Sequence, residues 1–343
     1  MSPAILVGID TEADDQWTAE GRRRLAVTNA LRLPPLQELF DGFGVRPTYL
    51  VTHEMATRHE SAQVLRALAR TGRCEIGAHL HPWSSPPFRP EDLSGHTYPN
   101  RLPTDVLERQ LTELTHTIET ELGARPTTYR AGRNGVDGRQ LAALERLGYT
   151  VDTSVDPLFN ERRKGGPAFA GAPGDPYRPD YADVCRPGAA RILEVPISAS
   201  TLPRLPRALE RAYASLAPIP WRGAFRRLGL RPVWLRPSYS PVAEMTAFAS
   251  RLAGRGAPCF NVIFHSSELI PGGSPYTPDE GSVTRFLDGL RRLLEHLTAR
   301  LGGVGRTHAE FARQQDQATR PAGSTPDASA GVQGDATQRP PAQ

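Results

Sequence analysis

Cys74-Glu75-Ile76-Gly77-Ala78-His79-Leu80-His81-Pro82-Trp83 is a short apolar strand that runs into a loop, with two histidines where the strand leaves the sheet. Side chains alternate along an extended chain, so the imidazoles of His79 and His81 point the same way. Two neutral imidazoles placed like this can bind one borderline metal ion such as Zn²⁺. The pair is equally compatible with two solvated histidines, so the rest of the chain has to decide between these interpretations.

Short apolar strands followed by polar residues recur along the chain. We predict strands at residues 5–9, 48–51, 75–78, 128–130, 150–152, 192–196, 233–236 and 260–265. Amphipathic helices are predicted between them, at residues 34–43, 60–71, 104–122, 138–147, 241–253 and 278–301. Strands and helices that alternate seven or eight times predict parallel strands joined by right-handed crossovers. The predicted fold class is therefore α/β, a distorted (β/α)7–8 barrel in a single domain.

The barrel domain is predicted to span residues 1–313. After Phe311 the sequence is rich in Gln, Ala, Pro, Ser and Thr. Such a composition cannot bury enough apolar surface to fold, so residues 314–343 are predicted to form a disordered tail. Residues 160–191 are rich in Gly, Pro and charged residues, which predicts a long loop that either lines the substrate or lies on the surface.

Composition narrows the classes of partner. The 343 residues carry a net charge of only +4, without a basic stripe interleaved with aromatic residues, which argues against nucleic-acid binding. The three cysteines are too few and too widely spaced for a disulfide framework. The first residues lack the basic and apolar regions of a signal peptide, and no run approaches the ~18 apolar residues of a membrane span. We expect a cytoplasmic protein that binds neither nucleic acid nor membrane; the oligomeric state stays open.

In a parallel barrel the active site lies at the carboxyl ends of the strands. The polar residues of this chain gather at those ends: Asp10, Glu12 and Asp14 after the first strand, His79 and His81 after the third, Arg130 in the fourth, Asp152 in the fifth, and His265 at the end of the last. Each alone has a structural explanation as a helix cap, an ion pair or a core imidazole. Their common position favours one shared active site.

The order of these residues resembles the polysaccharide deacetylase family, also called the NodB-homology or fourth carbohydrate esterase family. The resemblance rests on Asp10 after the first strand, Glu75-Ile76-Gly77-x-His79, Tyr129-Arg130-Ala131-Gly132 and a late apolar-apolar-His265, and it covers about residues 4–311. The variants Asp10-Thr11-Glu12 and His79-Leu80-His81-Pro82-Trp83 resemble the WalW-type branch of that family.

The resemblance implies metal-dependent hydrolysis that releases acetate from an N-acetylated sugar or glycan intermediate. Asp10 would be the general base for the attacking water, Arg130 would pair with Asp10 and orient it, and His265 would protonate the leaving amine. His79 and His81 would bind a divalent metal, with Zn²⁺ as the expected ion. The chemistry is coherent, because an amide is a poor electrophile that gains from a cation on its carbonyl and from a paired base and acid.

Two departures from the family pattern concern the metal. The family usually has a second Asp directly after the base, where this chain has Thr11, so the acidic ligand is Glu12 or Asp14, or is absent. We favour Glu12, because it follows Asp10 most closely and has the longer reach; the alternative is that Asp14 caps the next segment and Glu12 is solvated. The family's two histidines are also spaced four apart, whereas His79 and His81 are two apart.

Two other functions stay open from the sequence. The chain could hydrolyse another small C–N amide, of the ureide or formamide type, on the same barrel. It could also be a catalytically inactive carbohydrate-binding barrel. Asp10, Arg130 and His265 argue against the second alternative, because a binding module needs no base and acid.

Overall fold

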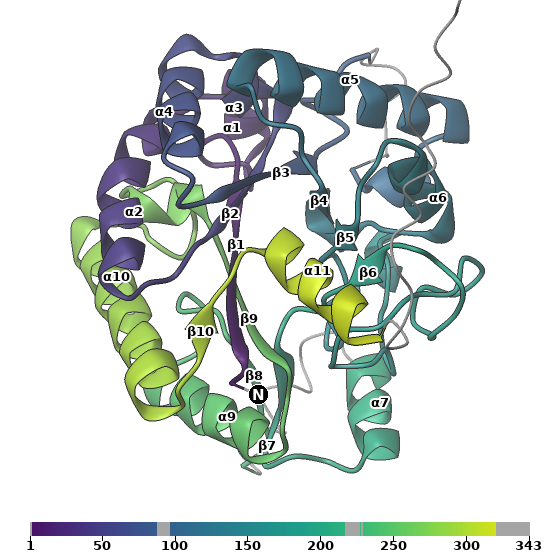
Figure 1. Cartoon of the computed structure of the whole chain (residues 1–343), viewed down its shortest axis with the longest axis vertical. Helices are drawn as coiled ribbons and strands as arrows, with labels where there is room; N and C mark the ends of the chain where they lie inside the picture. Colours follow the sequence, from purple (N-terminus) through teal and green to yellow (C-terminus); the bar gives the residue numbers. More distant parts are fainter. Residues whose placement is uncertain (1, 88–96, 217–226, 228, 320–343) are drawn as a thin grey trace, which may run out of the picture.

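The structure is a computed structural model that describes residues 2–87, 97–216, 227 and 229–319. Its main sheet has eight parallel strands: β1 (Ala4–Thr11), β2 (Thr48–Val51), β3 (Glu75–Leu80), β4 (Thr128–Ala131), β5 (Val151–Asp152), β6 (Leu193–Glu194), β9 (Cys259–His265) and β10 (Val304–Gly305). β9 pairs with one edge of β1, and β10 and β2 pair with the other; the sheet then continues in chain order to β6. The sheet curls into a half-barrel (Figure 1), which confirms the predicted single-domain α/β barrel fold.

Helices cover the outside of this curled sheet (Figure 1). The helices of the described residues are α1 (Ala19–Arg24), α2 (Leu33–Gly42), α3 (His53–Thr57), α4 (His59–Arg70), α5 (Thr104–Leu122), α6 (Gly138–Arg146), α7 (Arg207–Leu216), α9 (Val242–Gly254), α10 (Glu280–Glu295) and α11 (His308–Thr319). Of these, α11 does not cover the outside but lies across one end of the barrel (Figure 1). All six predicted helices are confirmed, and α10 continues into a π-helical turn at His296–Arg300. α5 ends at Gly123, whose φ of 66° suits a residue without a Cβ.

The two faces of β1 show how the core divides. Ile5, Val7 and Ile9 point outward and pack in the large cluster that the helices cover. Ala4 and Leu6 point into the barrel, where they form a second cluster with Phe311 of α11. α11 therefore fills the amino-terminal end of the barrel, while Asp10, further along the inward face of β1, lies toward the other end.

Individual hydrogen bonds of side chains and backbone, rather than a regular strand ladder, join the two free edges of the half-barrel. Asn261 of β9 donates its amide hydrogens to the carbonyl oxygens of Val195 and Pro196, which follow β6, at 3.0 and 3.1 Å. The backbone N–H of Asn261 also donates to Ser198 Oγ at 2.9 Å. The backbone N–H of Ser198 in turn donates to the carbonyl oxygen of Asn261 at 3.2 Å, so side-chain and backbone hydrogen bonds together tie β9 to the segment after β6.

One predicted strand pairs differently from our expectation. Residues 233–236 were predicted to join the parallel sheet, but β8 (Arg231–Trp234) pairs antiparallel with β7 (Ala199–Leu202) in a separate two-stranded sheet. Pro232 lies inside β8 and has no backbone N–H to donate to a neighbouring strand. A central strand needs such donors toward both of its neighbours, so a proline fits better in an edge strand, as in this two-stranded sheet. That prediction was wrong in its pairing.

The predicted domain boundary falls inside a helix. α11 continues to Thr319, so residues 314–319 belong to this helix and not to a tail. Residues 320–343 lie outside the described residues, and their disorder stays a prediction. None of the helices in the described ranges is long and apolar enough to cross a membrane.

His308, the first residue of α11, gives a testable pH dependence. Its ring is fully buried between Thr48 Oγ1 at 2.9 Å and Asn261 Oδ1 at 3.1 Å. Burial, aided by the charge of Arg130, lowers the pKa of His308 to about 3. The unfolded chain, with an ordinary histidine pKa, therefore binds a proton as the pH falls through about 6.5, while the folded chain does not, and stability falls.

Because of this one histidine, we expect the free energy of unfolding to fall by roughly 2 kcal/mol between pH 7 and pH 5. Urea unfolding of the wild type and of His308→Gln at both pH values measures it. The variant should lose about that much less over the interval, whatever its stability at pH 7. Equal losses in both proteins would show that His308 is protonated in the folded state.

Candidate functional site

β1 carries two carboxylates on its inward face. Asp10 is inside the strand and Glu12 directly follows it, so the period-two alternation turns both the same way. Thr11 between them turns aside and donates from Oγ1 to the carbonyl oxygen of Ile9 at 3.0 Å. Asp10 and Glu12 are almost completely buried, with relative exposures of 4% and 2%.

Glu12 faces the two histidines of β3 and the residue after it. Glu12 Oε2 lies 2.7 Å from His81 Nε2 and 3.8 Å from His79 Nε2. One ligand atom from each of the three residues lies within 4.8 Å of the other two, and all three side chains are buried. The expectation that the histidines point the same way and meet Glu12 therefore matches the observed geometry.

The protonation of this triad suits a cation. Burial lowers the pKa of His79 to about 4 and that of His81 to about 3, so both rings are neutral at pH 7, as metal ligands must be. The carbonyl oxygen of Arg130 lies 2.9 Å from His79 Nδ1 and accepts its proton, which leaves Nε2 with a free lone pair toward Glu12. Burial disfavours the charged form of Glu12 and raises its pKa. A bound cation would stabilise that charged form.

The donor set of two imidazoles and one carboxylate is one that Zn²⁺ uses in catalytic sites, with a further position left for water. The residues present therefore fit a single divalent ion. Gly132 allows the close packing behind this site, because a Cβ there would lie 2.3 Å from His81 Nδ1.

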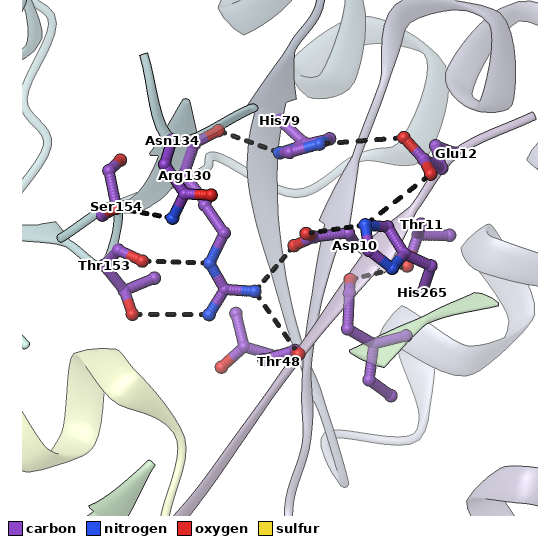
Figure 2. Close-up of polar contacts among 12 residues, drawn as sticks. Asp10, Thr11, Glu12, Thr48, His79, Arg130, Asn134, Thr153, Ser154 and His265 are labelled. Carbon is purple, nitrogen blue, oxygen red and sulfur yellow. Dashed lines mark hydrogen bonds and ion pairs between the residues drawn. The ribbon is translucent and has the colours of Figure 1, made fainter. Parts of the chain in front are cut away.

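Asp10 is held by a buried ion pair. Arg130 Nη1 donates to Asp10 Oδ1 at 2.6 Å, while its Nε donates to the carbonyl oxygen of Thr153 at 2.9 Å (Figure 2). Burial alone would raise the pKa of Asp10, but the charge of Arg130 outweighs it, aided by the nearby histidines, and holds that pKa well below its ordinary value. Asp10 is therefore a carboxylate at every physiological pH.

His265 at the end of β9 stands on the other side of the two carboxylates. Register places it directly beside Asp10, and its Nε2 lies 3.5 Å from Asp10 Oδ2 and 3.8 Å from Glu12 Oε1 (Figure 2). Burial and the charge of Arg236 lower the pKa of His265, but the three carboxylates around the ring outweigh them and raise it above its ordinary value. The ring is thus biased toward the imidazolium form.

Two residues behind His265 received no role from the sequence. Glu268 Oε1 lies 3.1 Å from His265 Nδ1, and Arg236 Nη2 lies 2.9 Å from the same nitrogen. Arg236 also donates to Glu268 at 2.6 Å. Protonated Nδ1 can donate to Glu268, and unprotonated Nδ1 can accept from Arg236, so both charge states of the ring have a partner. The i,i+3 spacing of His265 and Glu268 could have signalled the first contact; Arg236 has no such signal.

Asp14 does not reach the triad. Its carboxylate accepts hydrogen bonds from the backbone N–H groups of Thr28 and Asn29 at 3.0 and 3.2 Å, and from both of their side chains. It anchors the short 3₁₀ helix Thr28–Arg32, in line with the capping alternative. We therefore withdraw Asp14 as a candidate metal ligand and keep Glu12.

A cavity lies away from this site, on another part of the described structure. It has a volume of about 810 Å³ and is lined by part of the loop over residues 160–191, by α7 and α9, and by Cys259, the first residue of β9. The amino ends of parallel strands face away from Asp10 and His265. Part of the long loop thus lines this cavity, while its first residues lie beside Tyr98, whose hydroxyl is 3.5 Å from Glu161 Oε2.

Comparisons with known proteins bear on the fold. No family model matches this chain, and no curated protein matches its sequence. A candidate polysaccharide deacetylase from Mycobacterium smegmatis has a similar structure, with 15% identity, a TM-score of 0.54, and coverage of 95% of each chain. A candidate glycoside hydrolase/deacetylase from Parabacteroides distasonis gives 13% identity and a TM-score of 0.56 over 92% of this chain and 70% of its own. At these identities the similarity shows a shared fold.

The geometry predicts which carboxylate binds metal. Glu12→Gln should weaken Zn²⁺ affinity by more than the roughly 10–100-fold typical of losing an outer-shell partner. Asp14→Asn, which keeps one of the two oxygens that accept from Thr28 and Asn29 and leaves the triad itself unchanged, is the control and should leave the affinity unchanged. Chelator competition measures both. Loss of affinity only in Asp14→Asn would return the role to Asp14, and no loss in either would place the ion elsewhere.

Proposed function

We propose that this protein is a metal-dependent hydrolase that removes the acetyl group from an N-acetylated sugar or glycan intermediate. The proposal includes membership of the polysaccharide deacetylase family, in its WalW-type branch. The observation that carries it is the placement of Asp10 and His265 on one side of a buried Glu12, with His79 and His81 on the other. A base, an acid and a metal triad thus meet at the carboxyl ends of the strands.

Glu12, His79 and His81 would hold the divalent ion. When bound, the ion supplies a Lewis acid that polarises the amide carbonyl and acidifies water. The rest of the chemistry falls to residues of the chain.

Asp10 would take the proton of the attacking water. Arg130 occupies Oδ1 and fixes the carboxylate, and Oδ2, on the side of His265, remains for the water. An ionised base that is already in position costs no reorganisation at the moment of reaction.

His265 would give a proton to the amine as the C–N bond breaks. Its Nε2 faces the same space as Asp10 Oδ2, and the surrounding carboxylates favour the protonated ring. Glu268 would accept a hydrogen bond from the protonated Nδ1 of His265 before the transfer. Arg236 would donate a hydrogen bond to the same nitrogen when Nδ1 carries no proton.

The two alternatives differ from this proposal in what they release. A ureide or formamide hydrolase would cleave a ureide, or release formate from a formamide, and leave N-acetyl groups in place; an inactive carbohydrate-binding barrel would hydrolyse none of these. Incubating the zinc-loaded protein with N-acetylated sugars, oligosaccharides and nucleotide sugars, and separately with a ureide and a formamide, while measuring acetate, formate, free amine and loss of the ureide, separates the three. Sugar binding without acetate would support the binding barrel. The cytoplasmic location stays a prediction from the sequence.

Asp10→Asn and His265→Gln should each lower kcat by about 10²–10⁴-fold, as expected for loss of a general base or acid. Metal content should stay near that of the wild type in both variants. His265→Gln, which is close to isosteric, should also keep the melting temperature, whereas Asp10→Asn should lower it, because it leaves the buried charge of Arg130 without its counter-charge. The loss in His265→Gln should be smaller with an activated anilide, whose leaving group needs no proton. Turnover near the wild-type rate in either variant would show that the chemistry is misplaced.

A further inference from the structure

Four arginines surround the candidate site, and they divide into two pairs by their partners. Arg130 forms an ion pair with Asp10, and Arg236 with Glu268. Arg22 and Arg133 form no ion pair with any carboxylate in the described part of the chain; their hydrogen bonds go to neutral oxygens. Neither of these two positive charges is therefore paired directly with a carboxylate: Asp15 and Glu12 act on Arg22 without a direct ion pair, and Glu161 reaches Arg133 only through the Tyr98 hydroxyl, 3.5 Å from Glu161 Oε2.

Arg22 of α1 is fixed against the metal triad through an aromatic ring. It donates from Nε to the carbonyl oxygen of Gln16 at 2.8 Å and from Nη2 to that of Trp17 at 3.2 Å. Its guanidinium carbon lies 5.1 Å from the Trp83 ring, and that ring stacks on His81 with centroids 4.1 Å apart. Only the width of one indole ring separates this charge from a proposed metal ligand.

Arg133 approaches the same side from β4. It follows Gly132, which packs against His81, and its own backbone is left-handed, with φ of 53°. The side chain donates to Thr97 Oγ1 at 2.6 Å and to the Tyr98 hydroxyl at 2.8 Å, with its guanidinium 4.1 Å from the Tyr98 ring. A strained backbone and two tethers hold this half-buried arginine in place.

The two guanidinium groups act on each other and on the triad. Burial, followed by the charge of Arg133, lowers the pKa of Arg22, although Asp15 and Glu12 oppose it. A guanidinium that is partly desolvated and repelled by a second one gains from an anion that both can bind, and its planar fork suits an oxyanion. Among the described residues, no carboxylate forms a direct ion pair with either guanidinium, and the hydrogen bonds given for both go to neutral oxygens.

We infer that the substrate carries an oxyanion, such as a carboxylate, phosphate or sulfate, and that Arg22 and Arg133 bind it beside Trp83 while the amide lies at the metal triad. This inference rests on the proposed function for the amide part of the substrate. It adds the requirement that the substrate carry a negative charge, which the metal triad, the base and the acid do not need.

The kinetic test compares N-acetylglucosamine with two charged relatives, N-acetylglucosamine 6-phosphate and N-acetylmuramic acid. At least one charged sugar should exceed the neutral one in kcat/KM by about 10–100-fold, the range of a charge-assisted hydrogen bond. In Arg22→Gln and in Arg133→Gln this ratio should fall about tenfold or more. Arg23→Gln, which changes an exposed neighbour of Arg22 in α1, is the matched control and should keep the wild-type ratio.

Calorimetric binding of the deacetylated sugars glucosamine and glucosamine 6-phosphate gives a readout that needs no turnover. The phosphate should bind more tightly to the wild type and to Arg23→Gln, and lose this advantage in the other two variants. Acetate release without any preference for charge, together with equal binding, overturns the oxyanion site and leaves the proposed function standing. Arginine-dependent binding without acetate release overturns the proposed function and supports the oxyanion site.

Discussion

The ion pair between Arg130 and Asp10 is the constraint on which the inside of this barrel depends. Arg130 is the largest fully buried side chain, and its guanidinium crosses from β4 to the carboxylate of β1. A Cβ at Gly8 would lie 2.5 Å from Arg130 Nη2, so only glycine leaves room for the crossing. A buried charge without its partner is strongly destabilising, so neither residue can be lost alone without cost. The same pair that stabilises the interior also fixes the base of the candidate site.

This ion pair lies between two ends of the interior that are filled differently. Below it, α11 closes the amino-terminal opening with Phe311, which clusters with Leu6, and with the buried ring of His308, whose two nitrogens each have a polar partner. Above it come Glu12, the histidines and the aromatic ring of Trp17, which lies 5.1 Å from the His265 ring. The polar side chains below are thus satisfied within the structure, whereas those above lie at the carboxyl ends of the strands, where a parallel barrel has its active site.

The sequence predicted the parts of this arrangement that follow from strand periodicity. The strands that carry Asp10, His79, Arg130 and His265 are confirmed, and the carboxyl-end rule then brings their side chains to one edge. The pairing of β8 could not be predicted, because its apolar run looks like that of a barrel strand and only Pro232 hints otherwise. α11 was missed because few of its residues are buried, and a short mixed run gives little helical period.

Partners of the site that come from other segments were beyond any local pattern. Arg236 reaches His265 from a loop that follows β8, and no sequence spacing links the two. Asp14 was named for the opposite reason: alternation alone places it beside Glu12, but the strand ends at Thr11 and the chain then turns toward Thr28. Periodicity applies only while the chain stays extended, so the prediction holds at Glu12, directly after the strand, and fails at Asp14.

The two departures from the family pattern share one geometric basis. The base and the favoured acidic ligand are two residues apart in β1 and its extension, and the two histidines are two residues apart in and after β3. Both spacings equal the side-chain period of an extended strand, so each pair presents its donors on the inward face without a turn. Thr11, at the position where the family usually has its second Asp, is directed to the backbone of β1 instead. The change in the acid motif and the change in histidine spacing thus complement each other, since both build the proposed ligand set directly from the ends of neighbouring parallel strands.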